Sequence, residues 1–178
     1  GLWARLAYCR AVSQLSFFSA ESVPPAVTDL TGVLAGPGQI VVVGSSFTGE
    51  SFELALARYD ADGDLDASFG DGGRVQAVPG IGRAIARQAD GKYVVAGETT
   101  RDGVANVLIA RWDSDGSLDT SFGDGGAITT AGGVASAVAL QGDGNILVGG
   151  TTALDDFFVA RYEVGAIRRC ADANRHGA

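Results

Sequence analysis

The chain has 178 residues, 46% of them hydrophobic, with 27 glycines, 4 prolines and a formal net charge of −8. Such a composition suits one domain or a small array of repeats, and many glycines with few prolines indicate tight turns rather than a disordered linker. The negative charge argues against nucleic-acid binding, because it repels phosphates, and no apolar run is long enough for membrane insertion.

The N-terminal residues 1–27 are a degenerate half-repeat. The first twenty residues are fairly apolar, but Arg5 and Arg10 interrupt them, which is not typical of a secretory signal. The sequence contains no methionine, so we expect a processed product or a fragment. Cys9 and Cys170 lie near opposite ends, and they either pair in an oxidising compartment or remain free thiols.

Residues 54–73 and 107–126 carry the clearest copies of an internal repeat. LALARYDADGDLDASFGDGG and VLIARWDSDGSLDTSFGDGG are identical at 13 of 20 positions, at an offset of 53. An Ala-Arg pair begins at residues 4, 57, 110 and 160, and the last interval is 50 because the loop before Arg161 is three residues shorter. Repeats of this length indicate propellers, solenoids or arrays.

The second repeat shows what one unit contains. We expect strands over residues 82–88, 92–98 and 105–112, and a fourth strand from residues 117–123 and 126–130 with a glycine-rich bend between them. Four short strands joined by Gly/Asp turns predict an all-β chain of β-propeller-type repeats, with four antiparallel strands per blade of about 53 residues.

The third strand of this unit is apolar on both faces. Side chains alternate along a strand, so Val107 and Ile109 share one face with Arg111, while Leu108 and Trp112 lie on the other. A blade packed between two neighbours needs this pattern, whereas a one-sided sheet has a polar face. A right-handed β-helix is the main structural alternative, although it rarely carries so many hairpin turns.

The repeats divide the chain into five parts and give about three to three and a half blades. The parts are the half-repeat at 1–27, repeats at 28–80 and 81–133, a truncated repeat at 134–163 and a polar tail at 164–178. Closed propellers have four to eight blades, so we expect self-association or the remainder of a longer propeller. The N-terminal segment is a candidate to complete the C-terminal blade, within one chain or between two.

The segments ARYDADGDLDASFGDGG, ARWDSDGSLDTSFGDGG and QADGKYVVAG resemble the delta-60 repeat of bacterial proteins. The resemblance covers about residues 28–162. It implies a propeller protein that is exported, in the cell envelope or outside the cell, and it implies no particular reaction.

The acidic turn DADGDLD is a candidate calcium site. Alternating carboxylates on a tight turn supply the hard oxygen ligands that Ca²⁺ takes, but the spacing differs from an EF-hand and the second copy has Ser117 in place of one carboxylate. We favour a hairpin in which Asp caps its own backbone and Gly adopts a positive φ. The weak metal candidates are Asp60, Asp62, Asp64 and Asp66, and we otherwise expect no cofactor.

The repeated arginines (Arg58, Arg111, Arg161 and Arg5) lie in apolar strands. We expect each to pair with a carboxylate, such as Asp66 or Asp119, rather than to bind an anionic ligand.

The GDGG segments lack the Lys-Ser/Thr and the helix of a phosphate-binding loop, so we expect turns. His176 is the only histidine and lies in the polar tail, so no nucleophilic triad or zinc site is evident and we expect no catalytic residues.

We expect the functional residues at positions that differ between the repeats. The loops between second and third strands, at 45–51, 99–104 and 151–156, differ while their flanking strands do not, and loops on a rigid scaffold carry specificity. We predict a non-enzymatic scaffold or binding module for a protein or carbohydrate ligand. The alternative is a lactonase- or sugar-dehydrogenase-like propeller enzyme with a metal in its central channel.

Overall fold

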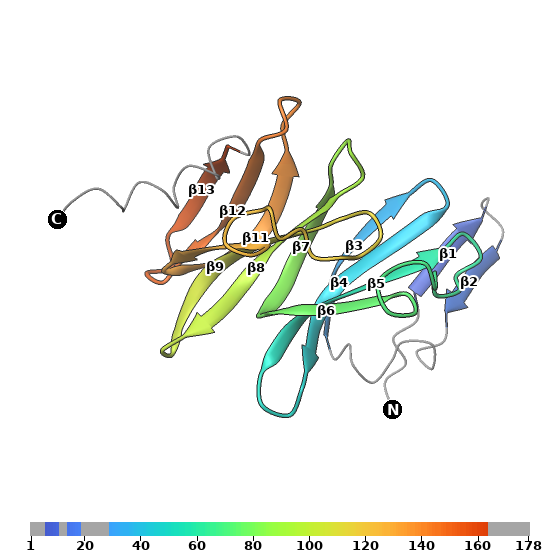
Figure 1. The fold of residues 1–178 in the computed structure, drawn as a ribbon, viewed down its shortest axis with the longest axis horizontal. Helices are drawn as coiled ribbons and strands as arrows, with labels where there is room; N and C mark the ends of the chain where they lie inside the picture. The colour runs from blue at the N-terminus through green and yellow to red at the C-terminus, as the bar shows by residue number, and fades with distance from the viewer. Residues whose placement is uncertain (1–5, 11–13, 19–28, 164–178) are drawn as a thin grey trace.

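The computed structural model describes residues 6–10, 14–18 and 29–163, which form antiparallel sheets (Figure 1). The first full sheet has the order β3-β4-β5-β6. The second has the order β10-β9-β8-β7, and the third has the order β11-β12-β13. The strands of the first sheet are β3 (Asp29–Gly36), β4 (Gln39–Phe47), β5 (Phe52–Asp60) and β6 (Arg74–Pro79).

The second and third sheets repeat the first. The strands of the second sheet are β7 (Ile81–Arg87), β8 (Tyr93–Arg101), β9 (Val104–Trp112) and β10 (Ala127–Ala131). The third sheet contains β11 (Gly133–Leu140), β12 (Ile146–Thr152) and β13 (Phe157–Tyr162). The all-β prediction with four antiparallel strands per repeat is confirmed, and the antiparallel pairing differs from the parallel coils of a β-helix. The described residues contain no helix that could cross a membrane.

The N-terminal strands stand apart from the third sheet. β1 (Leu6–Arg10) pairs only with β2 (Gln14–Phe18) in a two-stranded sheet of their own. In Figure 1 they lie at the end of the array formed by β3–β6, away from β13. The described N-terminal strands do not join the third sheet here. Completion of the C-terminal blade by the N-terminal segment, within one chain or between two, stays a prediction.

The three sheets stack face to face like blades. The first strand of each blade lies innermost, because β7 contacts both β3 and β11, while β6 and β10 form the outer ends of their sheets. One apolar core fills the space between the first and second blades, and another fills the space between the second and third. Leu108 and Trp112 belong to the first core and Val107 and Ile109 to the second, so the two-faced pattern of the third strand is confirmed.

A glycine in the second strand of each blade allows the first strand to come very close. Gly44, Gly97 and Gly150 are spaced by the repeat, and each faces a β-bulge of its blade's first strand. A Cβ built on Gly97 would lie 1.9 Å from the carbonyl oxygen of Ile81, and the corresponding distances at the other two glycines are 1.8 and 2.0 Å. No side chain fits there, so this glycine is required by the packing of backbone against backbone.

The fourth strand is shorter than the sequence predicts. Only Ala127–Ala131 forms β10, and residues 113–126 fold as successive turns apart from isolated bridges. The turns hold themselves together locally: the amide of Phe122 donates to the carbonyl of Asp119, and the amide of Gly126 donates to that of Phe122. The strand predicted over 117–123 is therefore wrong, because Ser, Asp and Gly satisfy the backbone within the turn.

Candidate functional site

The repeated arginine of the first blade connects two blades. Arg58 Nε donates to Asp66 Oδ2 at 2.8 Å, and a second guanidinium nitrogen donates to Ser68 Oγ at 2.9 Å. A third nitrogen donates to the carbonyl of Ser114 in the next blade at 2.6 Å. The guanidinium also lies 4.6 Å from the ring centroid of Phe69, within cation–π range. All its charge-bearing nitrogens therefore serve contacts within the protein.

The second blade repeats this cluster with an added lysine. Arg111 Nε donates to Asp119 Oδ2 at 2.8 Å and the guanidinium lies 4.5 Å from the Phe122 ring. Lys92 Nζ lies 3.0 Å from the same carboxylate oxygen and also contacts Asp113. The predicted pairing of the repeated arginine with a carboxylate is thus confirmed in both complete repeats.

Arg161 of the third blade departs from the pattern. It is 51% exposed at its side chain and pairs with Glu163 at 2.7 Å, two residues along the chain. The described residues of this repeat contain no counterpart of the Leu-Asp segment that supplies Asp66 and Asp119. The third arginine is therefore free to change partner, because an exposed pair of this kind contributes little free energy.

The Asp119 carboxyl is the most strongly perturbed acid of the repeat. Burial raises its pKa, but the hydrogen bond from Ser121, the hydrogen bond from Lys92 and the charge of Arg111 outweigh burial and hold the pKa well below the usual range. The hydrogen bond from Ser68 likewise lowers the pKa of Asp66. Both aspartates are therefore ionised at neutral pH, which suits ion pairs and not general acid catalysis.

Stability is expected to fall in acid because of Asp119. Its pKa is lower in the folded chain than in the unfolded chain, so the unfolded chain binds more protons. The stabilisation is complete above the ordinary aspartate pKa of about 3.9 and is lost as the pH falls below it. Urea titrations between about pH 5 and pH 3 should show a falling free energy of unfolding, with a smaller fall in Asp119→Asn. Equal slopes in the two proteins would contradict this role.

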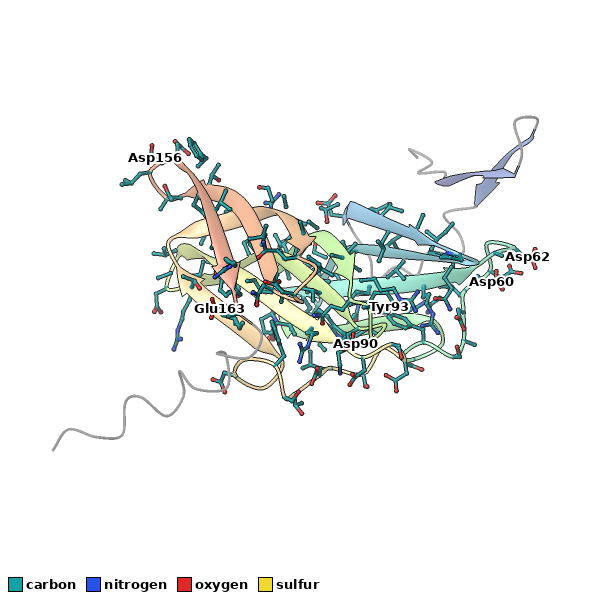
Figure 2. All side chains as sticks on the ribbon, turned by 90° about the horizontal axis from the view of Figure 1, so that it is seen from above. Asp60, Asp62, Asp90, Tyr93, Asp156 and Glu163 are labelled. Atoms are coloured by element: carbon teal, nitrogen blue, oxygen red, sulfur yellow. The ribbon has the colours of Figure 1, made fainter. Side chains whose placement is uncertain are left out.

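The acidic turn caps its own backbone. Asp60 Oδ1 accepts hydrogen bonds from the amides of Asp62, Gly63 and Asp64 at 3.0, 2.9 and 3.0 Å, and Gly63 has a φ of +92°. The preferred interpretation of the turn is confirmed. Figure 2 shows Asp60 and Asp62 at the exposed end of a loop, and Asp66 is turned instead toward Arg58. Within residues 29–163 no group of three or more His, Cys, Asp or Glu is placed to hold a metal ion.

Removal of calcium is expected to leave the melting temperature unchanged. The Asp60 carboxylate already holds three backbone amides, and Asp66 already holds a guanidinium, so neither needs a cation. Differential scanning calorimetry with excess EDTA and with millimolar Ca²⁺ measures this directly. A midpoint several degrees higher in Ca²⁺ would instead identify the turn, or another part of the chain, as a calcium site.

The GDGG segments are turns, as predicted. Gly70 and Gly123 have φ values of +56° and +58°, which favour glycine. The amide of Gly70 donates to the carbonyl of Asp115 in the next blade at 2.7 Å, next to the bond from Arg58 to Ser114. In the first repeat this segment therefore joins neighbouring blades.

The three hairpins between second and third strands lie along the same side of the array (Figure 1). Their exposed apolar side chains differ from blade to blade: Phe47 and Phe52 in the first, Val104 in the second and Leu154 in the third. The two phenylalanines are cross-strand partners with ring centroids 5.1 Å apart, and each is nearly half exposed.

This aromatic pair was not singled out from the sequence. One repeat later its two positions carry Thr100 and Ala105, which are cross-strand partners in the same way. The sequence therefore held a signal for this pair: two aromatic residues, one on each side of a variable loop, at positions where the next repeat has none. Cys9, Cys170 and His176 cannot be placed alongside these groups, because their side chains lie outside the part of the chain whose side chains the structure describes.

Comparison with known proteins agrees with this geometry. A family model described as a domain of unknown function (DUF5122) β-propeller matches residues 38–69 and 88–122. Each matched segment begins beside the first hairpin turn of a blade and ends at the repeated phenylalanine, Phe69 or Phe122. The fold is of the β-propeller type. No curated protein matches the chain.

Proposed function

We propose that this chain is a non-enzymatic bacterial repeat protein of the delta-60 type that acts as a scaffold or binding module, exported to the cell envelope or outside the cell. One observation carries the proposal. The repeated arginines and the aspartates that pair with them make their contacts inside the protein: Arg58 bonds Asp66, Ser68 and the Ser114 carbonyl, and Arg111 bonds Asp119. We therefore place a ligand at the positions whose residues differ between the repeats.

The first hairpin is the best-supported ligand site among those positions. Phe47 and Phe52 present two tilted rings at the hairpin end of the two central strands of the first sheet, 49% and 45% exposed. Exposed aromatic rings on a fixed scaffold suit a carbohydrate or protein ligand, since they offer a large apolar surface at little cost in side-chain entropy. Thr48 and Ser51 close the loop through hydrogen bonds, so the rings are held in place.

The experiment compares binding with turnover. The wild-type chain is applied to arrays of glycans and of extracellular peptides, together with the double variant Phe47→Ser/Phe52→Ser and the control Val33→Ser, which changes an exposed apolar residue elsewhere on the first blade. The proposal expects a specific signal that drops at least about tenfold in the double variant and persists in the control. Binding that ignores the hairpin would refute the site. Metal-dependent hydrolysis of lactones or oxidation of sugars would refute the non-enzymatic function.

A further inference from the structure

Two fully buried side chains of the second blade carry polar atoms that bind no other atom of the described residues. Tyr93 is 1% exposed and Trp112 is 0% exposed. Neither the phenol oxygen of Tyr93 nor the indole Nε1 of Trp112 has a hydrogen-bond partner among those residues. The other buried polar atoms in this position belong to side chains that are only partly buried. Tyr93 and Trp112 therefore lack the access to bulk solvent that usually satisfies such a group.

The two polar groups belong to neighbouring side chains. Tyr93 on β8 and Trp112 on β9 are directly opposite each other in the strand register. Both side chains lie in the apolar core between the first and second blades. Directly opposite residues of an antiparallel pair have Cβ atoms about 4.5–5.5 Å apart. A single small ligand between the blades is therefore able to contact both side chains.

This pair departs from the repeat. The first and third blades have isoleucine at the position of Tyr93 and tyrosine at the position of Trp112. In the third blade that tyrosine, Tyr162, shares a hydrogen bond with Thr130 Oγ1 of the second blade at 3.2 Å. One repeat before Thr130 the chain has Ala77, which carries no hydroxyl. The junction of the first two blades therefore lacks the side-chain partner that the next junction supplies.

The surroundings of the pair indicate which ligand it takes. The indole N–H of Trp112 can only donate a hydrogen bond, whereas the hydroxyl of Tyr93 donates or accepts one. The Tyr93 ring meets the Phe69 ring edge-on, with centroids 5.8 Å apart, and Phe69 is 0% exposed. A closely packed core of this kind favours the smallest ligand that accepts and donates hydrogen bonds, which is water.

We propose that one water molecule is bound between the first and second blades, where it accepts a hydrogen bond from Trp112 Nε1 and bonds the Tyr93 hydroxyl. This inference goes beyond the proposed ligand-binding function and does not depend on it. Native proteins leave few buried polar groups unsatisfied, and ordered waters commonly bond those that no protein atom reaches. The water is therefore a component of the blade junction and stabilises it.

A crystal structure of the full chain, at a resolution that shows ordered water, tests the site directly. We expect one density peak within about 3.2 Å of both the Trp112 Nε1 and the Tyr93 hydroxyl oxygen. Crystals grown in bromide should show no anomalous signal at this peak. The absence of a peak, a protein atom bonded to either group, or a bromide signal there would each overturn the proposal.

The variant Tyr93→Phe tests the same site in solution. It removes the hydroxyl and keeps the ring against Phe69, so the unfolding equilibrium constant at a fixed urea concentration should rise about fivefold as the bond to water is lost. Tyr162→Phe is the matched control, because its bond to Thr130 is exposed, and its constant should stay within about twofold of the wild type. A Tyr93→Phe chain as stable as the wild type, or more stable, would overturn the proposal, since it would show that the buried hydroxyl makes no hydrogen bond.

Discussion

Replacing Gly97 by alanine is expected to lower the free energy of unfolding by about 3 kcal/mol, at the upper end of the usual cost of overpacking. The added Cβ would lie 1.9 Å from the carbonyl oxygen of Ile81 and 3.0 Å from its carbonyl carbon. These are backbone atoms of β7, which is held between β8 and the neighbouring blades, so they cannot swing aside as a flexible side chain can.

Urea denaturation of Gly97→Ala against the wild type measures this loss. Gly142→Ala is the control, because a Cβ at Gly142 meets nothing within 4 Å. Its stability should stay within about 0.5 kcal/mol of the wild type. If the two variants were equally stable, the close approach of the first and second strands of the blade would not exist in solution.

Removing the Asp119 side chain is the second change with a large expected effect. Asp119→Ala leaves Arg111 and Lys92 without the carboxylate oxygen that lies 2.8 and 3.0 Å from them. Arg111 is 9% exposed at its side chain, so its charge would remain buried without compensation. Breaking a buried pair in this way costs about 3–5 kcal/mol.

The first repeat supplies a matched comparison. Asp66→Ala removes the equivalent carboxylate, but the Asp66 side chain is 19% exposed and pairs with Arg58 alone. The guanidinium keeps its bonds to Ser68 and to the Ser114 carbonyl. We therefore expect a clearly smaller loss than at Asp119, read from the same urea curves. A loss at Asp119 no greater than at Asp66 would show that the lysine and the deeper burial add nothing.

Much of the fold could be predicted from the sequence because two complete copies of the repeat carry the same residue pattern. The Asp-Gly turn around Asp60 and the pairing of Arg58 with Asp66 are local, lying within eight residues along the chain. Interactions of this range depend on spacing and residue type, which the sequence displays. The two apolar faces of β9 followed from alternation alone.

Other features depended on tertiary contacts and were not predictable in the same way. The need for Gly97 arises from a bulge in a different strand. The sequence shows that this glycine recurs as Gly44 and Gly150, but not the backbone contact that requires it. The exposure of Phe157 was equally hidden, because its apolar side chain stands at the position of the buried Val107, and among the described residues no further sheet packs against it. Whether such a side chain is buried therefore depends on the packing of neighbouring blades and not on the sequence of its own strand.

The central claim is that the repeated segments at 61–73 and 113–126 are ordered parts of the fold, while the variable hairpins are free to bind. Amide hydrogen exchange measured residue by residue tests it most directly. The amides of Asp119, Phe122 and Gly126 donate to backbone carbonyls, as do those of Asp66, Phe69 and Gly73 in the first blade. They should be protected nearly as well as the strands, and hairpin residues such as Gly49 and Gly103 should exchange quickly. Fast exchange throughout both repeated segments would contradict the account.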